Sequence, residues 1–286
     1  YVPENYSRRY SGPLTLRRAL AGSYNIPAVA VLNQVGIENA VNMAHTLGIT
    51  DLNEPYHGLS LALGGYPVKP LDMAYAFSVF ANGGQMLGTP VPESRQTAGL
   101  RTLDPAVILK VTNAQGQVLY EYEEPERKQV LSPEVAYLMS SVLSDNAART
   151  PIFGPNSPMY VPDRPTAVKT GTTNDFYDGW TIGYTRQYSV AVWVGNTEHI
   201  PMRNADGSRV AAPMWRDVMD YLHEGLPVEQ FERPAGIVTV TVDAASGKLP
   251  TEFSPATIQE VFVAGTEPTE ADDMHQGYSI CRESGL

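Results

Sequence analysis

The sequence predicts a mixed α/β fold of the α+β type, in which helices flank an antiparallel sheet. Apolar residues recur at helical spacing in several separate regions, whereas later regions alternate in the manner of strands. The 24 glycines and 23 prolines indicate frequent turns, which argue against a helical bundle. A chain of 286 residues with 43% hydrophobic side chains is long enough to bury a sizeable core.

The first half of the chain favours helices followed by a hairpin. Residues 14–47 predict short helices, because apolar side chains repeat on one face of each segment. Residues 70–81 predict a stronger helix, since Pro70 suits a first helical turn. Residues 107–122 alternate about a central turn and predict a hairpin. The punctuating glycines of the first region are Gly22, Gly36 and Gly48.

The central region combines a capped helix, a loop and the main strands. Ser132 is a suitable cap for a helix over 133–145. The prolines within 151–165 predict a loop laid on the surface. Residues 166–172 predict one strand, and residues 180–195 predict an antiparallel hairpin that packs beside it.

The last region divides the chain into two expected parts. A helix is expected over about 213–222, followed by a strand over 237–242 and a short apolar run at 261–263. We therefore expect a large domain over 1–230, and a small β-rich appendage with a tail over 231–286.

Composition narrows the possible partners. The formal net charge of −11 argues against nucleic acid, because phosphate binding needs a basic surface. The single cysteine, Cys281, cannot form a disulfide within the chain. No pair of the five histidines has metal-ligand spacing, so the histidines predict no metal site. The apolar stretch Ile26–Leu32 is too short to cross a bilayer.

The strongest local motif runs from Lys169 to Thr173, with the sequence Lys-Thr-Gly-Thr-Thr. A strand edge offers backbone groups to an extended peptide, and Gly171 lets that peptide approach closely. Lys169 offers a cation, and Thr170 and Thr172 offer hydroxyls that suit a substrate carboxylate. The alternative is an ordinary strand end with a solvated lysine.

A second motif, Ser23-Tyr24-Asn25, follows the first predicted helix. A serine and an asparagine two positions apart in a turn can direct both side chains at one point. The serine can relay a proton, and the asparagine can hold a peptide amide. The alternative is a helix stop with local side-chain-to-backbone hydrogen bonds.

Taken together, the two motifs and their surroundings resemble the class A penicillin-binding proteins, a branch of the penicillin-recognising serine acyl-transferases. The resemblance covers nearly the whole chain. The matching segments are Thr15–Leu20, Ser23–Val29, Leu61–Gly65, Val68–Leu71, Phe80–Gly84, Lys169–Thr173, Asp178–Trp180, Val192–Gly195, Ser246–Lys248, Thr251-Glu252 and Gly265–Pro268.

One family motif is absent. The family's nucleophile lies in a Ser-x-x-Lys motif before the Ser-x-Asn, and this chain contains no Ser-x-x-Lys. Thr166 and Lys169 have that spacing, but this lysine already belongs to the strand motif. Because the stretch Tyr1–Tyr6 reads like the middle of a family domain, we expect the nucleophile upstream and a β-lactamase/transpeptidase-like fold incomplete at its N-terminus.

The resemblance implies a peptidoglycan D,D-transpeptidase that cross-links stem peptides through a serine acyl-enzyme. In that role Ser23 would assist proton transfer to the leaving group, and Lys169 would polarise it. Asn25 would hold the substrate amide, while Thr170 and Thr172 would bind the terminal carboxylate. The Thr172 N–H would also form half of an oxyanion hole. Gly171, Thr173 and Tyr24 complete the expected substrate-binding set, although Tyr24 is equally consistent with a half-buried structural role.

The resemblance also implies the partners and the location. The ligands would be the D-Ala-D-Ala end of a stem peptide and β-lactam antibiotics. The reaction would need neither a metal nor an organic cofactor. The parent protein would carry a glycosyltransferase domain and a membrane anchor upstream, and would work on the outer face of the bacterial cell membrane. The fragment alone is expected to be inactive.

Two rival functions stay open at this point. One is a serine β-lactamase of the same superfamily, and the other is a non-catalytic module that binds peptidoglycan or a partner. Beside the site, core packing is expected for Trp180 and Trp193. Asn174, Asp175 and Asp178 are expected only to order the loop.

Overall fold

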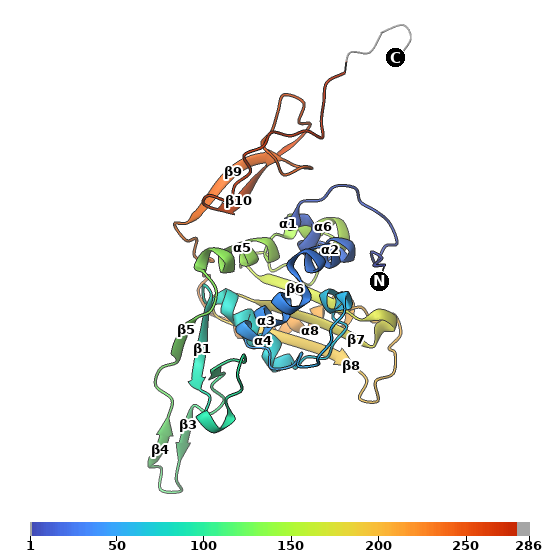
Figure 1. The fold of residues 1–286 in the computed structure, drawn as a ribbon. Helices are drawn as coiled ribbons and strands as arrows, with labels where there is room; N and C mark the ends of the chain where they lie inside the picture. The colour runs from blue at the N-terminus through green and yellow to red at the C-terminus, as the bar shows by residue number, and fades with distance from the viewer. Residues whose placement is uncertain (1, 279–286) are drawn as a thin grey trace.

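The structure, a computed structural model, describes residues 2–278, and Cys281 lies outside them. Its centre is an antiparallel sheet in the order β6-β7-β8, with helices on both faces (Figure 1). The strands are β6 (Ala167–Thr172), β7 (Asp178–Tyr184) and β8 (Ser189–Gly195). The architecture agrees with the predicted antiparallel sheet flanked by helices.

Two hydrophobic clusters hold the layers together. Neighbouring strand residues point to opposite faces of a sheet. On one face Ala167 and Tyr184 pack with Leu143. On the other face Val168 packs with Trp215. The helices on the first face are α4 (Pro70–Ala81) and α5 (Pro133–Leu143), and the helix on the second is α8 (Ala212–Leu222).

The predicted helices over 14–47 are present as three short elements, namely α1 (Leu16–Ala21), α2 (Asn25–Val35) and α3 (Ile37–Leu47). The other short helices are η1 (Leu59–Leu63), η2 (Glu93–Arg95), η3 (Asn174–Phe176) and α7 (Gly207–Val210). Ser132 caps α5 as predicted, because its side chain accepts a hydrogen bond from the Val135 N–H.

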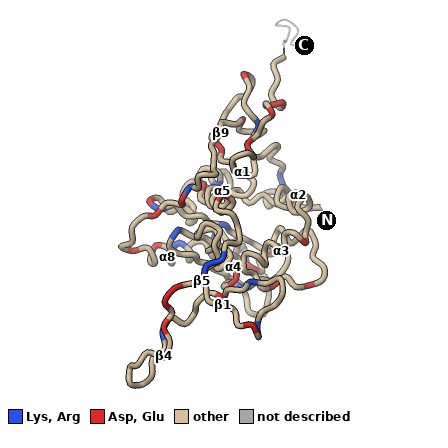
Figure 2. Tube along the Cα trace, turned by 60° about the vertical axis from the view of Figure 1, so that its left-hand side comes forward, with Lys and Arg blue, Asp and Glu red and all other residues tan. Residues whose placement is uncertain are grey.

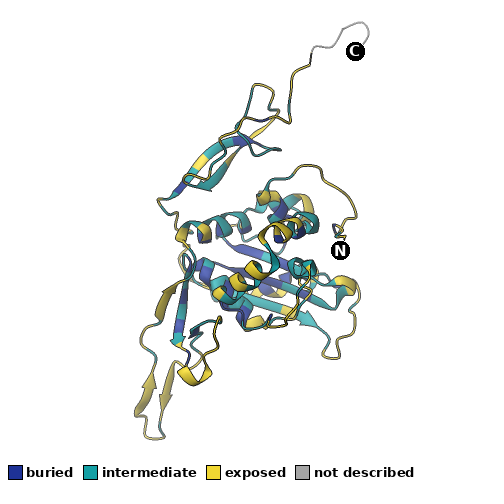
Figure 3. Ribbon diagram, in the orientation of Figure 1, coloured by how far each residue is buried: buried dark blue, intermediate teal, exposed yellow. Residues whose placement is uncertain are grey.

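A second sheet and a projecting hairpin lie to one side of the central sheet and its helices (Figures 1 and 3). The sheet has the order β2-β1-β5, and β3 pairs with β4 in the hairpin predicted over 107–122. The hairpin strands are exposed to solvent. Figure 2 shows Lys and Arg interspersed with Asp and Glu along the trace. The bounds are β1 (Gln85–Pro90), β2 (Leu103–Asp104), β3 (Lys110–Thr112), β4 (Val118–Glu121) and β5 (Glu126–Gln129).

The proline-rich region is only partly a loop, so the prediction over 151–165 was wrong at its start. Helix α6 (Asn146–Phe153) contains Pro151. Asp145 caps this helix by accepting from the Ala148 N–H, and Gly154 ends it with a φ of 78°. Because Pro151 lies near the end of a short helix, it removes a single backbone hydrogen bond there.

The C-terminal part forms a separate two-stranded sheet from β9 (Ile237–Asp243) and β10 (Thr257–Val263). Arg17 of α1 connects this C-terminal sheet to helix α5. Its Nε lies 2.8 Å from Glu260 Oε2, and its Nη1 donates to the Ser141 carbonyl at 2.9 Å. Burial opposes ionisation of Glu260, but the hydrogen bonds and charge of Arg17 outweigh burial and lower the pKa of Glu260.

We expect Arg17→Met to loosen the appendage. The change keeps an apolar stem but leaves Glu260 without its guanidinium, and a hydrogen bond to a charged group contributes about 1.5–3 kcal/mol. Chymotrypsin cleavage after Phe231 in the linker 223–236 is therefore expected to accelerate about tenfold or more, because this side chain packs against Tyr184 and cleavage follows the open population. Arg209→Met is the control, since the Arg209 side chain is 73% exposed. Equal cleavage rates in the two variants would contradict a tethering role for Arg17.

Candidate active site

The Ser23 turn connects α1 to α2 with an unusual backbone. Ser23 has a φ of 57°, in the left-handed region that residues with side chains rarely adopt. The Ser23 N–H donates to the Leu20 carbonyl at 3.1 Å, and the Tyr24 N–H donates to the Ala19 carbonyl at 3.0 Å. A Cβ on Gly22 would lie 2.6 Å from the Tyr24 ring, so the turn needs glycine there. Such backbone strain is often found where a side chain must be aimed.

The two motifs meet in space. Lys169 Nζ donates to Ser23 Oγ at 2.6 Å, across 146 positions of sequence. The same ammonium donates to the Thr170 carbonyl at 2.6 Å. Strand β6 pairs with β7 and forms one edge of the central sheet. The Ser23 turn and the Lys-Thr-Gly strand therefore form one polar cluster.

The pKa of Lys169 is lowered to about 8. Burial is the larger cause, because a desolvated ammonium loses its hydration. Repulsion from the Arg149 guanidinium is the second cause. Near neutral pH this lysine can therefore hold a proton or release it at modest cost, which suits a group that moves protons.

Arg149 was missed by the sequence analysis. Its side chain is 2% exposed, although arginine is rarely buried, and it contacts the carbonyl oxygens of Leu143 and Met159. Burial lowers the pKa of Arg149 to about 10. Nothing in the sequence pattern marks this residue, since it lies within a short helix that was not predicted.

The threonines of the strand motif differ in their surroundings. Thr170 is buried. Thr172 Oγ1 accepts a hydrogen bond from the Gly207 N–H at 2.9 Å, which anchors the end of β6 to α7. Thr173 Oγ1 accepts from the Asp178 N–H at 2.7 Å and so orders the turn into β7. Gly171 lies opposite Trp180 in the pairing of β6 with β7.

Asn25 and Tyr24 lie at the start of α2, beside the N-terminal segment. Asn25 Nδ2 donates to the Glu4 carbonyl at 2.8 Å, and the Ile26 N–H donates to Asn5 Oδ1 at 3.2 Å. The Asn25 amide therefore already holds a peptide carbonyl, here one of its own chain. Tyr24 is half-buried and packs over Gly22.

The two tryptophans beside the site are less buried than the sequence predicted. Trp193 was expected in the core but is 41% exposed, and its Nε1 donates to Asp178 Oδ1 at 2.8 Å. Trp180 is half-buried. The fully buried tryptophan is Trp215 on α8. Alternation along β8 places Trp193 on the same face as Ser189, which contacts α4, but four residues further along the strand. The strand pattern alone does not reveal how far along that face a helix extends.

The family profiles divide the chain in two. The profile described as the penicillin binding protein transpeptidase domain matches residues 3–220. The profile described as the penicillin-binding protein 1A, C-terminal domain matches residues 233–277. The first match covers most of the chain.

Relatives and solved structures agree with these profiles. Penicillin-binding protein 1A of Clostridium botulinum (strain Hall) is 34% identical over 296 residues, covering 100% of this chain and 33% of the relative. The same-named protein of Aquifex aeolicus is 36% identical over 274 residues, covering 94% and 34%. This chain thus spans about a third of the length of these relatives.

The solved structure of penicillin-binding protein 1A from Haemophilus influenzae superposes with a TM-score of 0.78 at 25% identity, over 95% of this chain and 43% of that one. PonA1 of Mycobacterium tuberculosis in complex with penicillin V has the same fold, with a TM-score of 0.67 at 24% identity over 81% of this chain and 62% of that one. The resemblance read from the motifs is confirmed, and the chain belongs to the penicillin-binding protein transpeptidase family, in its class A branch.

Proposed function

We propose that this chain is the transpeptidase region of an enzyme that cross-links peptidoglycan. The observation that carries the proposal is the 2.6 Å contact between Lys169 Nζ and Ser23 Oγ beside an edge strand. A lysine and a serine in hydrogen-bond contact can move a proton, and an edge strand can hold an extended peptide. Family membership points to the same reaction.

The proposed reaction proceeds through a serine acyl-enzyme. A serine from a Ser-x-x-Lys segment, absent from these 286 residues, attacks the D-Ala-D-Ala carbonyl of a stem peptide. The serine oxygen–acyl bond forms, the peptide C–N bond breaks, and D-alanine leaves with a proton relayed through Ser23. An amine from a neighbouring stem then attacks the ester, which forms the cross-link and releases the serine.

The other motif residues bind and orient the substrate in this proposal. Lys169 polarises Ser23, and Asn25 holds the substrate amide where it now holds the Glu4 carbonyl. The hydroxyls of Thr170 and Thr172 bind the terminal carboxylate. The Thr172 N–H stabilises the oxyanion, as one donor of a kind that lowers barriers by about 3 kcal/mol. Gly171, Thr173 and Tyr24 shape the strand edge and the turn around the substrate.

The division of the chain and its setting are part of the proposal. Residues 1–230 form the transpeptidase domain, and residues 231–286 form the appendage with its tail. The separate β9–β10 sheet supports this division. The parent protein carries a glycosyltransferase domain and a membrane anchor, and acts at the outer face of the bacterial membrane on stem peptides and β-lactams. In residues 2–278, no helix has the length and apolar character to cross a bilayer.

Fluorescent-penicillin labelling tests the proposed function. The complete protein is expected to form one stable covalent adduct, whereas residues 1–286 alone are expected to remain unlabelled, because they hold no Ser-x-x-Lys. Lipid-linked substrate then reports cross-linking directly. Rapid turnover of the antibiotic would instead identify a β-lactamase, and an unlabelled complete protein would leave only a binding module.

The lowered pKa of Lys169 predicts the pH dependence of acylation. Below about pH 8 the side chain is protonated and can donate to Ser23, and above that pH it is increasingly neutral. The acylation rate of the complete protein is therefore expected to fall as the pH rises through about 8. Arg149→Met removes a neighbouring positive charge, so it should raise the pKa of Lys169 and move this fall to higher pH.

The control for this pH profile is Arg127→Met, because Arg127 is exposed on β5. Its profile is expected to match that of the unchanged protein. If the acylation rate of Arg149→Met fell at the same pH as that of the unchanged protein, titration of Lys169 would not be the cause of the fall.

A further inference from the structure

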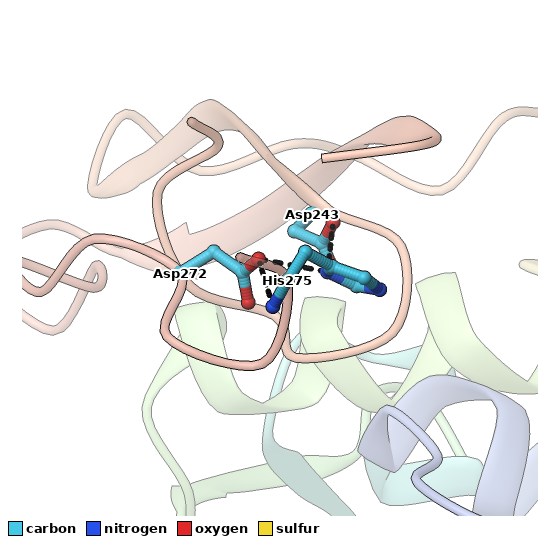
Figure 4. Close-up of side chains that lie close together, drawn as sticks. All are labelled: Asp243, Asp272 and His275. Atoms are coloured by element: carbon cyan, nitrogen blue, oxygen red, sulfur yellow. Dashed lines mark hydrogen bonds and ion pairs between the residues drawn. The ribbon is translucent and has the colours of Figure 1, made fainter. Parts of the chain in front are cut away.

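Three side chains of the appendage converge on one point (Figure 4), and the appendage lies apart from the β6–β7–β8 sheet (Figure 1). Asp243 ends β9, whereas Asp272 and His275 lie in the loop that follows β10. Backbone hydrogen bonds fix this loop, since the Asp272 N–H donates to the Leu249 carbonyl at 2.8 Å. The fold thus joins groups that are about thirty positions apart in the sequence.

The ligand atoms of this cluster have the spacing of a metal site. His275 Nδ1 lies 2.7 Å from Asp272 Oδ2 and 3.4 Å from Asp243 Oδ2. The three ligand atoms all lie within 4.8 Å of one another. In tetrahedral Zn²⁺ sites with ligand distances of about 2.0–2.1 Å, neighbouring ligand atoms are about 3.3 Å apart. Small side-chain adjustments would therefore enclose one ion.

One carboxylate oxygen of the cluster, Asp243 Oδ2, accepts no hydrogen bond and has only the 3.4 Å contact with His275 Nδ1. Asp243 is 0% exposed. Its Oδ1 accepts from the N–H groups of Ala245 and Ser246 at 2.8 and 2.9 Å. Its Oδ2 is buried and accepts no hydrogen bond, although it points at His275 and Asp272 (Figure 4). A buried carboxylate oxygen without a donor is costly, and a bound cation removes that cost.

The charges of the cluster also favour a cation. Two buried carboxylates face a single imidazole, so the group stays negative even when His275 is protonated. Asp272 is already oriented, because it accepts from the N–H groups of Met274 and His275, each at 3.2 Å. The His275 side chain is 27% exposed, which leaves an approach for an ion and for a water ligand.

We propose that Asp243, Asp272 and His275 bind a divalent transition-metal cation, with Zn²⁺ the best match to one imidazole and two carboxylates. The fourth ligand is water on the side of His275. The ion joins the end of β9 to the loop after β10 and stabilises the appendage. It takes no part in acyl transfer, so this site is independent of the proposed transpeptidase function.

Zinc titration of the metal-free 286-residue chain by calorimetry tests the site. One Zn²⁺ per chain is expected, with a melting temperature that rises with zinc concentration. His275→Gln and Asp243→Asn should each weaken binding about 100-fold or more, because even the outer partners of metal ligands contribute 10–100-fold. Asp273→Asn is the matched control, since this exposed neighbour pairs with Lys248 and lies outside the cluster.

Co²⁺ provides a second readout that does not depend on stability. The visible spectrum of the cobalt-loaded chain should show four- or five-coordinate bands, which Asp273→Asn retains and His275→Gln loses. Absence of stoichiometric zinc binding would overturn the proposal and leave only an imidazole in contact with two carboxylates. Unchanged affinity in His275→Gln would overturn it as well, because the ion would then lie elsewhere.

Discussion

Replacing Lys169 with alanine in the complete protein is expected to slow acylation by penicillin about 10²–10⁴-fold, the range typical of a lost proton-transfer group. The ammonium donates to Ser23 Oγ at 2.6 Å, and alanine leaves that hydroxyl without a cation. The measurement is the rate of fluorescent-penicillin labelling at several antibiotic concentrations. The maximal rate should fall, whereas the melting temperature should change little.

Lys110→Ala is the control for this experiment. Lys110 lies on the exposed hairpin, where it pairs with Glu121 at 2.8 Å. Its labelling rate is expected to equal that of the unchanged protein. Near-normal labelling of Lys169→Ala would refute the role assigned to Lys169 and, with it, the catalytic meaning of the contact with Ser23.

Replacing Trp215 with alanine is expected to lower the free energy of unfolding by about 3–5 kcal/mol, the usual cost of removing a large aromatic side chain from a core. Trp215 is 0% exposed and packs against Met159 and Val168, between α8 and the central sheet. Denaturant unfolding followed by circular dichroism measures the change.

Two further variants separate packing from other effects. Trp215→Phe keeps a ring and removes an indole N–H that has no acceptor in the structure, so its cost should be clearly smaller. Trp193→Ala changes a side chain that is 41% exposed, and its cost should also be smaller. If Trp193→Ala lowered the free energy of unfolding as much as Trp215→Ala, the exposed fraction of a side chain would not identify the core of this protein.

Sequence patterns predicted most of this fold because its elements are locally encoded. The helix over 70–81 begins at a proline that suits its first turn, and the structure has α4 over the same residues. The hairpin over 107–122 was equally readable, since its strands alternate about a glycine turn. Pro151 misled the prediction, because a proline near the end of a capped helix costs less than one at its centre.

The contact between the two sequence motifs was predictable, but the electrostatics of the candidate site was not. Ser23 and Lys169 are marked by short motifs, and the fold brings them into contact. Arg149 carries no motif, and its influence on the pKa of Lys169 arises only from tertiary packing. The cluster of Asp243, Asp272 and His275 was not predicted for the same reason. Metal-ligand spacing was sought along the sequence, whereas these three side chains come together only through strand pairing and a loop.

Helix α1 links the appendage to the Ser23 turn, and this link matters when a shortened form of the protein is prepared. Arg17, which contacts Glu260 of the appendage, precedes Ser23 by six residues, a span of about 9 Å along a helix. A shortened protein that ends before β10 would lack Glu260. Arg17 would then lose its ion pair, and helix α1, which leads into the Ser23 turn, would lose its contact with the appendage. Shortened proteins made to test the proposed function should therefore extend beyond Val263, so that their rates of penicillin labelling reflect the intact geometry of the turn.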